Sequence, residues 1–439
     1  MTKITKYYEN IDINGALSIK DGTQADGYIL MSDSGGTATW VSQTSLSGSS
    51  GTGITIANTV FVSKNGSDST GVVEKITKPF LTISAATTAL NNAYPVSART
   101  GTVRYLVQVG SGYYTERIVL SNYTDYDLGD ATIELVSGTT SYTIDDNNVA
   151  CDSIIYGKPQ LIRSTAGSGG CVRTQHSATT LTIYANTIST TIGVGVSCVS
   201  GTQYIYTSGG VSSTANDGVT CSGGIQNIFG DASTAGCSGG IQVVRGNVSS
   251  TLFRAVGCFG GTQYIYGNAT TSANGNGASC SSGTQYIYGN VSCTNSAGTV
   301  SASAAVCTGG VQNIVGDIYT AAVDASAYGI RFQTTSSGST YQGNISCALA
   351  QPISISTGGS MMLRPGSKVL TNSSGRVGIT CPSGTPVLIL DNVTIVTLDS
   401  ASVSGTMTVK VYGTCQANFA VSGGITQQVG SIIVDTNVS

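Results

Sequence analysis

Charged residues are scarce in this chain: only 9% of its 439 residues are Asp, Glu, Lys or Arg, against about a quarter in an average globular protein. The net charge is −3 and there is no basic tract, so nucleic-acid binding through phosphate neutralisation is not expected. No apolar run approaches the roughly 20 residues of a membrane-spanning helix, so no membrane span is expected. The polar surface must therefore consist mainly of hydroxyl and amide groups.

Motifs for metals and cofactors are also missing. The 12 cysteines include no Cys-x-x-Cys pair, which argues against a zinc site, and His176 is the single histidine. There is no glycine-rich phosphate loop, nucleophile triad or calcium-binding nonapeptide. Residues 1–10 lack the apolar stretch of a secretory signal peptide. We therefore expect neither a metal nor a cofactor.

A repeated unit dominates the centre of the chain, and it reads Cys-x-x-Gly-x-Gln-x-Ile-x-Gly-Asn with tolerated substitutions. Its glutamines are Gln203, Gln226, Gln242, Gln263, Gln285 and Gln312, and Gln342 is interpreted as a last, degenerate copy. Successive glutamines from Gln203 to Gln312 are 16 to 27 residues apart. A step of this size with variable spacing is typical of one coil of a β-helix, in which strands are kept and loops vary.

Within each unit the residues alternate with the period of two that a β-strand requires. One parity holds Gln263 and Ile265 and is constant between units. The other parity varies: it holds Tyr264 and Tyr266, but in other units Asn227, Phe229, Arg245 and Val315. The constant parity is predicted to face the core, with equivalent residues of successive coils about 4.8 Å apart. Stacked glutamines can then form an amide ladder that satisfies otherwise buried polar groups.

Two further positions of the unit are assigned to corners of the coil. Asn and Asp follow glycine at the strand end, where they are expected because they tolerate a left-handed backbone. These residues are Asp231, Asn247, Asn268, Asn290, Asp317 and Asn344. The repeated cysteine is predicted to act as a small apolar side chain. Free, stacked thiols are favoured over disulfides between neighbouring coils, which are geometrically conceivable.

Three segments carry resemblances to known families. Residues 21–40 (DGTQADGYILMSDSGGTATW) resemble a short segment found near one end of bacteriophage tail fibres and related virion proteins. Residues 78–86 (KPFLTISAA) and 107–116 (VQVGSGYYTE) resemble the first part of pectin-lyase-like β-helices. The first resemblance implies a virion-attachment region, and the second implies a short helix, at about residues 81–91, that covers the first coil.

Together these observations predict an all-β fold: a right-handed parallel β-helix solenoid with a small N-terminal attachment region and a C-terminal β-domain. Residues 1–57 are assigned to the attachment region and a Ser/Gly-rich linker, and residues 58–351 to the solenoid shaft. The repeated motif stops after Pro352. Residues 352–439 are therefore predicted to form a different β-domain that serves as a cap, a tip or a trimerisation module.

Candidates for catalysis are few. Glycoside hydrolysis usually needs two carboxylates that flank the scissile bond, but no glutamate lies beyond Glu134. Asp231 and Asp317 take the corner position of the repeat and are interpreted as structural. Asp217 and Asp324 lie in predicted loops and are the remaining weak candidates, with no partner close to them in sequence.

Tyrosines are more suggestive of a binding surface. Six of them are predicted to form two outward columns on one face: Tyr204, Tyr206, Tyr264, Tyr266, Tyr286 and Tyr288. Aromatic faces with a phenolic edge suit carbohydrate binding and protein interfaces. The alternative is a stacked ladder that only stabilises the sheet or lies between protomers.

By resemblance, the protein is expected to be a structural, receptor-binding tail fibre or tailspike-like protein of a bacteriophage. It would be part of the virion and exposed to the extracellular medium. The resemblance also implies a homotrimer that contacts other tail or baseplate proteins and a bacterial surface glycan or protein. Two alternatives stay open: a tailspike that depolymerises polysaccharide as a glycoside hydrolase or lyase, and a bacterial surface adhesin. Enzymatic activity is not favoured.

Overall fold

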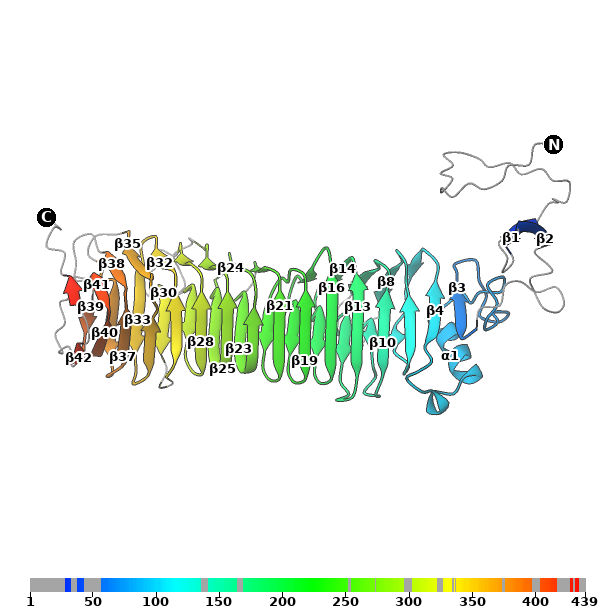
Figure 1. The fold of residues 1–439 in the computed structure, drawn as a ribbon, viewed down its shortest axis with the longest axis horizontal. Coiled ribbons are helices and arrows are strands. Elements are labelled where there is room, and N and C mark those ends of the chain that lie inside the picture. Colours follow the sequence, from blue (N-terminus) through cyan, green and yellow to red (C-terminus); the bar gives the residue numbers. More distant parts are fainter. Residues whose placement is uncertain are drawn as a thin grey trace, which may run out of the picture.

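The computed structural model of the chain is a long parallel β-solenoid with one α-helix near its N-terminal end (Figure 1). Strands make up 52% and helices 4% of the residues that the structure describes, which confirms the predicted all-β parallel β-helix. The structure describes residues 28–32, 38–42, 57–135, 141–163, 169–251, 254–272, 274–295, 302–321, 327–333, 335, 337–372, 376–396, 403–416, 427–428 and 431–433. None of the helices within these ranges is long and apolar enough to cross a membrane.

Each coil contributes strands to three parallel ladders that run along the solenoid axis. Ladder 1 consists of β6 (Ile118–Val119), β9 (Ile144–Asp145), β12 (Val172–Thr174), β15 (Val196–Cys198), β18 (Val219–Cys221), β20 (Ala235–Cys237), the first parts of β23 (Val256–Ile265) and β25 (Ala278–Tyr288), β27 (Ala305–Cys307), β30 (Tyr328–Gln333), β33 (Gln351–Ser356), β36 (Ile379–Ser383) and β39 (Val403–Gly405).

Ladder 2 carries the Gln-centred motif. It consists of β3 (Thr59–Val62), β4 (Tyr105–Val109), β7 (Thr124–Asp127), β10 (Asp152–Tyr156), β13 (Thr180–Ala185), β16 (Thr202–Thr207), β19 (Ile225–Phe229), β21 (Ile241–Arg245), the last parts of β23 and β25, β28 (Val311–Val315), β31 (Ser339–Gln342), β34 (Ser360–Leu363), β37 (Val387–Asp391), β40 (Thr408–Tyr412) and β42 (Gln427–Gln428).

Ladder 3 closes each coil with short strands. It consists of β5 (Tyr113–Tyr114), β8 (Thr132–Leu135), β11 (Gln160–Arg163), β14 (Thr187–Thr190), β17 (Val211–Ser213), β22 (Val248–Ser250), β24 (Ala269–Thr271), β26 (Val291–Cys293), β29 (Ile318–Thr320), β32 (Asn344–Cys347), β35 (Lys368–Thr371), β38 (Thr394–Val396), β41 (Thr414–Gln416) and β43 (Ser431–Ile433). Isolated bridges at Ala232 join β17 to β22. Outside the solenoid, β1 (Tyr28–Ser32) pairs with β2 (Ala38–Ser42) as an antiparallel hairpin.

Aliphatic side chains of one parity fill the interior, as the alternation predicts. In ladder 2, Ile205, Ile228, Val244, Ile265, Ile287 and Ile314 follow one another in register and are almost fully buried. Since each of these residues packs on its equivalent in the next coil, the core is a continuous apolar column along the axis.

The helix α1 (Ile83–Ala93) covers the first coil and starts two residues later than predicted. Its N-cap residue Thr82 accepts a hydrogen bond from the Ala85 N–H, and Glu116 accepts from the N–H groups of Ile83 and Ser84 at 2.9 and 2.8 Å. Buried Ile83 and Leu90 pack against the solenoid core. The helix thus shields an edge that would otherwise be open to further strand pairing.

The C-terminal boundary of the shaft differs from the prediction. The ladders cross residue 352 without a break, since β33 pairs with both β30 and β36, and pairing continues to β42 and β43. The strands described after this position are therefore further coils and not a separate β-domain. The motif ends because the position of Gln312 is taken over by Ser339, Met361, Leu388 and Val409 in successive coils.

Candidate functional site

The six repeated glutamines form one continuous hydrogen-bonded column in the interior, and none of them is exposed to solvent. The Nε2 group of each glutamine donates to Oε1 of the glutamine one coil earlier. The five distances, from Gln226 to Gln312, are 3.1, 2.8, 2.7, 2.7 and 2.8 Å. The second amide hydrogen is donated to a backbone carbonyl of ladder 1, for example from Gln242 to Gly236 at 3.1 Å. Both hydrogens of each amide from Gln226 to Gln312 are thereby satisfied, as expected for buried amides.

Gln342, interpreted from the sequence as a last copy of this glutamine, does not join the column. It pairs with Val315 and lies on the outward parity of β31, where its Nε2 donates to the Pro365 carbonyl at 3.4 Å. Tyr341 instead follows Ile314 in the interior. A shift of one residue moves a side chain to the opposite face of a strand, so the Tyr-Gln pair was assigned to the wrong parity.

A second ladder lies at the corner after each ladder 2 strand. The side-chain oxygen of Asp231 accepts from the backbone N–H of Asn247 at 2.7 Å, and this pattern repeats through Asn268, Asn290, Asp317 and Asn344 at 2.8 to 3.0 Å. None of these six residues has a positive φ, so the predicted left-handed backbone is wrong. Their side chains bind the backbone of the following coil, and a role for Asp231 or Asp317 in catalysis is not needed to explain them.

The repeated cysteines stack in register on ladder 1, from Cys198 to Cys307, and all 12 cysteines are free and buried. Their thiols point at carbonyls of the adjoining turn, for example Cys221 Sγ to Gly223 O at 3.3 Å. The pKa of Cys221 is raised by its contacts with the Cys198 and Cys237 thiols and by burial. Such thiols are poor metal ligands, and no group of three His, Cys, Asp or Glu residues suited to a metal occurs in the described ranges.

The predicted tyrosines lie on the outer side of ladder 2, and we call this surface the aromatic face. Its outer column consists of Tyr184, Tyr206, Phe229, Arg245, Tyr266 and Tyr288, and its middle column consists of Tyr204, Asn227, Val243, Tyr264 and Tyr286. The outer column includes Tyr184, which lies before the first repeat and was missed in the sequence. The signal for it was the same alternation in residues 180–185.

Neighbouring rings in these columns stack face to face. The ring centroids of Tyr184 and Tyr206 are 4.8 Å apart, and those of Tyr206 and Phe229 are 4.4 Å apart. Tyr266 and Tyr288 stack at 5.1 Å, and Tyr264 and Tyr286 at 5.0 Å. Because each stacked ring is covered by its neighbour, the face presents mainly ring edges and phenolic hydroxyl groups to solvent.

The two columns are not continuous rows of tyrosine. Asn227 and Val243 separate Tyr204 from Tyr264, and Phe229 and Arg245 separate Tyr206 from Tyr266. The exposed fractions of Tyr184, Tyr266 and Tyr288 are 42, 45 and 44%, values that leave the hydroxyl end of each side chain accessible. Burial and the nearby Tyr286 phenol raise the pKa of Tyr264, so its hydroxyl keeps the proton that it can donate.

Of the two weak catalytic candidates, the structure describes only Asp217. Asp217 lies beside Arg254, with Oδ2 and Nη2 3.7 Å apart, and the Arg254 guanidinium packs over the Phe259 ring at 4.4 Å. A partly exposed ion pair of this kind contributes little to stability and needs no catalytic explanation. Asp324 lies outside the described residues.

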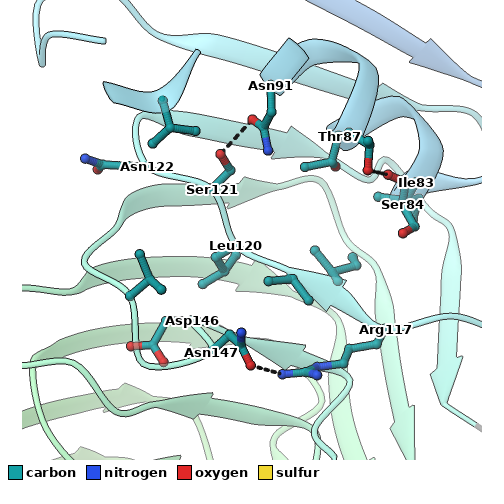
Figure 2. A pocket seen from close by; sticks show the side chains of 15 residues that line it. Ile83, Ser84, Thr87, Asn91, Arg117, Leu120, Ser121, Asn122, Asp146 and Asn147 are labelled. Carbon is teal, nitrogen blue, oxygen red and sulfur yellow. Dashed lines mark hydrogen bonds between the residues drawn. The ribbon is translucent and has the colours of Figure 1, made fainter. Parts of the chain in front are cut away.

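A cavity of about 370 Å³ lies between α1 and the first strand of ladder 1 (Figure 2). Most of its polar groups are already bonded, although Arg117 Nε is buried without a partner. Asn91 Oδ1 accepts from Ser121 Oγ at 2.8 Å, and Arg117 Nη2 donates to Asp145 at 2.7 Å and to Asn147 at 3.2 Å. Asp146 accepts from the backbone N–H groups of residues 148, 175 and 176. The cavity is thus a gap under the capping helix whose walls are bonded to each other, and the aromatic face is the better candidate for binding.

Comparison with known proteins does not add to this picture, since no protein family, no curated protein and no solved structure matches the chain.

Proposed function

We propose that the protein is a structural and receptor-binding component of a bacteriophage particle, a tail fibre or tailspike-like protein that binds a bacterial surface glycan through the aromatic face. The parallel β-solenoid fits a fibre, spike or adhesin role, because its ladders form a long, stiff rod. Residues 21–40 resemble a tail-fibre segment and support the placement in a virion. Residues 1–57 would then attach the protein to other tail or baseplate proteins.

The observation that carries the binding role is the row of exposed phenols on the outer column. These hydroxyl groups are held on a hydrogen-bonded sheet and recur in neighbouring coils, about 4.8 Å apart along the axis, as the pairs Tyr184–Tyr206 and Tyr266–Tyr288. Because the sheet already holds these side chains in place, the protein loses little conformational entropy when a ligand binds, which favours binding. Hydroxyl donors and acceptors beside apolar ring edges match the surface of a sugar chain.

Binding to host cells tests the aromatic face. Purified protein should bind intact host cells, and the double variant Tyr266→Ala/Tyr288→Ala should bind at least about tenfold more weakly, since two side chains each contribute about 1 kcal/mol or more. Tyr113→Ala is the matched control, because Tyr113 is 49% exposed but lies on β5 in ladder 3. Equal binding by the double variant and the wild type would remove the aromatic face from the receptor role.

Mass spectrometry of purified particles tests the virion assignment. Peptides of this chain should be present in particles and should co-sediment with tail proteins. Recovery of the chain only from bacterial surfaces would support the adhesin alternative. The proposed homotrimer predicts three times the mass of the 44.5 kDa chain in sedimentation equilibrium.

The depolymerase alternative is tested by incubating the protein with host capsule and measuring polymer length. Shortening that is abolished by Asp217→Ala or Asp324→Ala would establish a catalytic role for that residue. Shortening that survives both substitutions would place the chemistry elsewhere on the chain.

A further inference from the structure

Arg245 occupies a distinctive position on the aromatic face. It takes the place of an aromatic ring in the outer column, with its guanidinium 5.0 Å from the Phe229 centroid and 5.5 Å from the Tyr266 centroid. Its side chain is exposed, and none of the ion pairs within the described ranges includes it. The two rings therefore hold a guanidinium group whose charge is not balanced by a neighbouring carboxylate.

The strand residues that flank Arg245 on the aromatic face carry no other charge, and Asp231 lies at the corner two residues after Phe229, where its Oδ1 accepts from the Asn247 N–H at 2.7 Å. The outward residues of β16, β19, β21, β28 and the last parts of β23 and β25 are threonine, tyrosine, isoleucine, asparagine, phenylalanine and valine, apart from Arg245 itself. A guanidinium that forms no ion pair, on strands that carry no other charge, stays available to an external anion, and the flanking rings reduce its hydration.

We infer that this position selects a carboxylate-bearing sugar, so that the glycan bound by the aromatic face is an acidic polysaccharide; the inference rests on the proposed receptor role. A guanidinium can bind a carboxylate through two parallel N–H···O bonds, and its orientation here is restricted by the two rings. Tyr206 lies two coils before Arg245 in the same column, and Tyr266 and Tyr288 follow it. Their hydroxyl groups can contact the neighbouring sugars of an extended chain.

An alternative explanation is that Arg245 only fills a gap between two rings, with its aliphatic stem covering apolar surface. The two explanations differ in one measurable respect. If Arg245 is only a spacer, the protein binds a neutral and an acidic glycan equally well. If Arg245 binds a carboxylate, the protein binds the acidic glycan more tightly.

The test measures binding of the full-length protein to alginate, a polyuronate, and to the same polymer after its carboxyl groups are reduced to alcohols. The wild type should bind alginate at least about tenfold more tightly than the reduced polymer, as expected for one charge-assisted contact. Arg245→Gln should lose this preference and bind the two polymers with similar affinity. Arg331→Gln is the control, since it removes the same charge from an outward position of ladder 1.

Three outcomes overturn the inference: equal binding of both polymers by the wild type, an unchanged preference in Arg245→Gln, or an equal loss in Arg331→Gln. The first and second outcomes show that Arg245 does not bind the carboxylate. The third shows that the preference for the acidic polymer depends only on the net charge of the protein. If the wild type prefers neither polymer but Tyr266→Ala/Tyr288→Ala still loses host-cell binding, the proposed receptor role stands without this specificity. If that double variant binds cells normally, both proposals fail.

Discussion

The hydroxyl group of Tyr341 donates a 2.9 Å hydrogen bond to Oε1 of Gln312, the last glutamine of the interior ladder. This oxygen would otherwise face the apolar coil that follows, because Ser339 and then Met361 occupy the glutamine position there. At the other end of the ladder, Gln203 Nε2 donates to the Ser197 carbonyl at 2.9 Å. The amide column is thus closed at both ends, and no member of it is left with an unpaired oxygen.

Replacing a central glutamine should be costly. Gln263→Leu removes the donor to Gln242 Oε1 and the acceptor for Gln285 Nε2, and so leaves two buried polar groups unpaired. We expect a loss of about 2–5 kcal/mol in the free energy of unfolding, measured by denaturant titration. Gln342→Leu, on the outward parity, is the control and should change the midpoint little. A small effect of Gln263→Leu would mean that the ladder adds nothing beyond packing.

The turn between ladders 1 and 2 depends on glycine. Gly240 has a φ of +65°, and a Cβ there would lie 2.3 Å from the Gly224 carbonyl oxygen. Gly240→Ala should therefore destabilise the protein by about 2–4 kcal/mol, through left-handed strain and overpacking. Gly358→Ala is the matched control, because no atom lies within 4 Å of its Cβ position. Thermal midpoints of the two variants should differ clearly, and equal midpoints would contradict the close approach of the two turns.

The thiols should be unreactive in the folded protein. All 12 are buried, so a reagent in solution does not reach them, and burial also raises the pKa of Cys151 to about 12. A thiol reagent at pH 8 should label few sites in the native state and 12 per chain after unfolding in guanidinium without reductant. Fewer than 12 sites in the unfolded chain would reveal disulfides between coils.

Stability should fall in alkaline solution. Burial raises the pKa of Tyr341 well above its ordinary value of 10.0, so the folded state keeps this phenol protonated while the unfolded chain ionises it. The contribution is complete below pH 10 and is lost as pH rises above it, with a slope of about 1.4 kcal/mol per pH unit for one group. Tyr341→Phe should flatten the pH dependence of the unfolding midpoint above pH 10, and Tyr113→Phe, at an exposed position, should not. An identical pH profile for Tyr341→Phe and the wild type would contradict this assignment.

The sequence predicted the shaft well because its ladders are built from identical residues in register. Gln263, Ile265 and Tyr266 each recur at one position of the coil, so both parity and stacking could be read from the repeat. The later coils escaped prediction because Met361 and Leu388 occupy the same position as Gln312 without any recurring residue type. In those coils packing of varied apolar side chains replaces an amide ladder, and varied side chains carry no motif.

The candidate site was predicted less completely than the shaft. The alternation of the repeat placed Phe229 and Arg245 on the outward parity beside the six tyrosines. The pairing of β19 and β21 with their neighbours places these two residues between Tyr206 and Tyr266 in one column. The 16-residue step between Gln226 and Gln242 is short, yet it still forms a full coil, in which Arg245 pairs with Phe229. The sequence shows which residue types face outward, whereas the strand pairing shows which of them are neighbours on the surface.

The amides of the interior glutamines all point the same way along the axis, since every Nε2 faces the preceding coil. A segment inserted or lost during evolution preserves this polarity only when it comprises a whole turn of the backbone. The length of the rod is therefore expected to change in increments of about 4.8 Å, and homologous rods should differ by integral numbers of turns. Loops between the ladders are free of this constraint, so they can vary in size without altering reach.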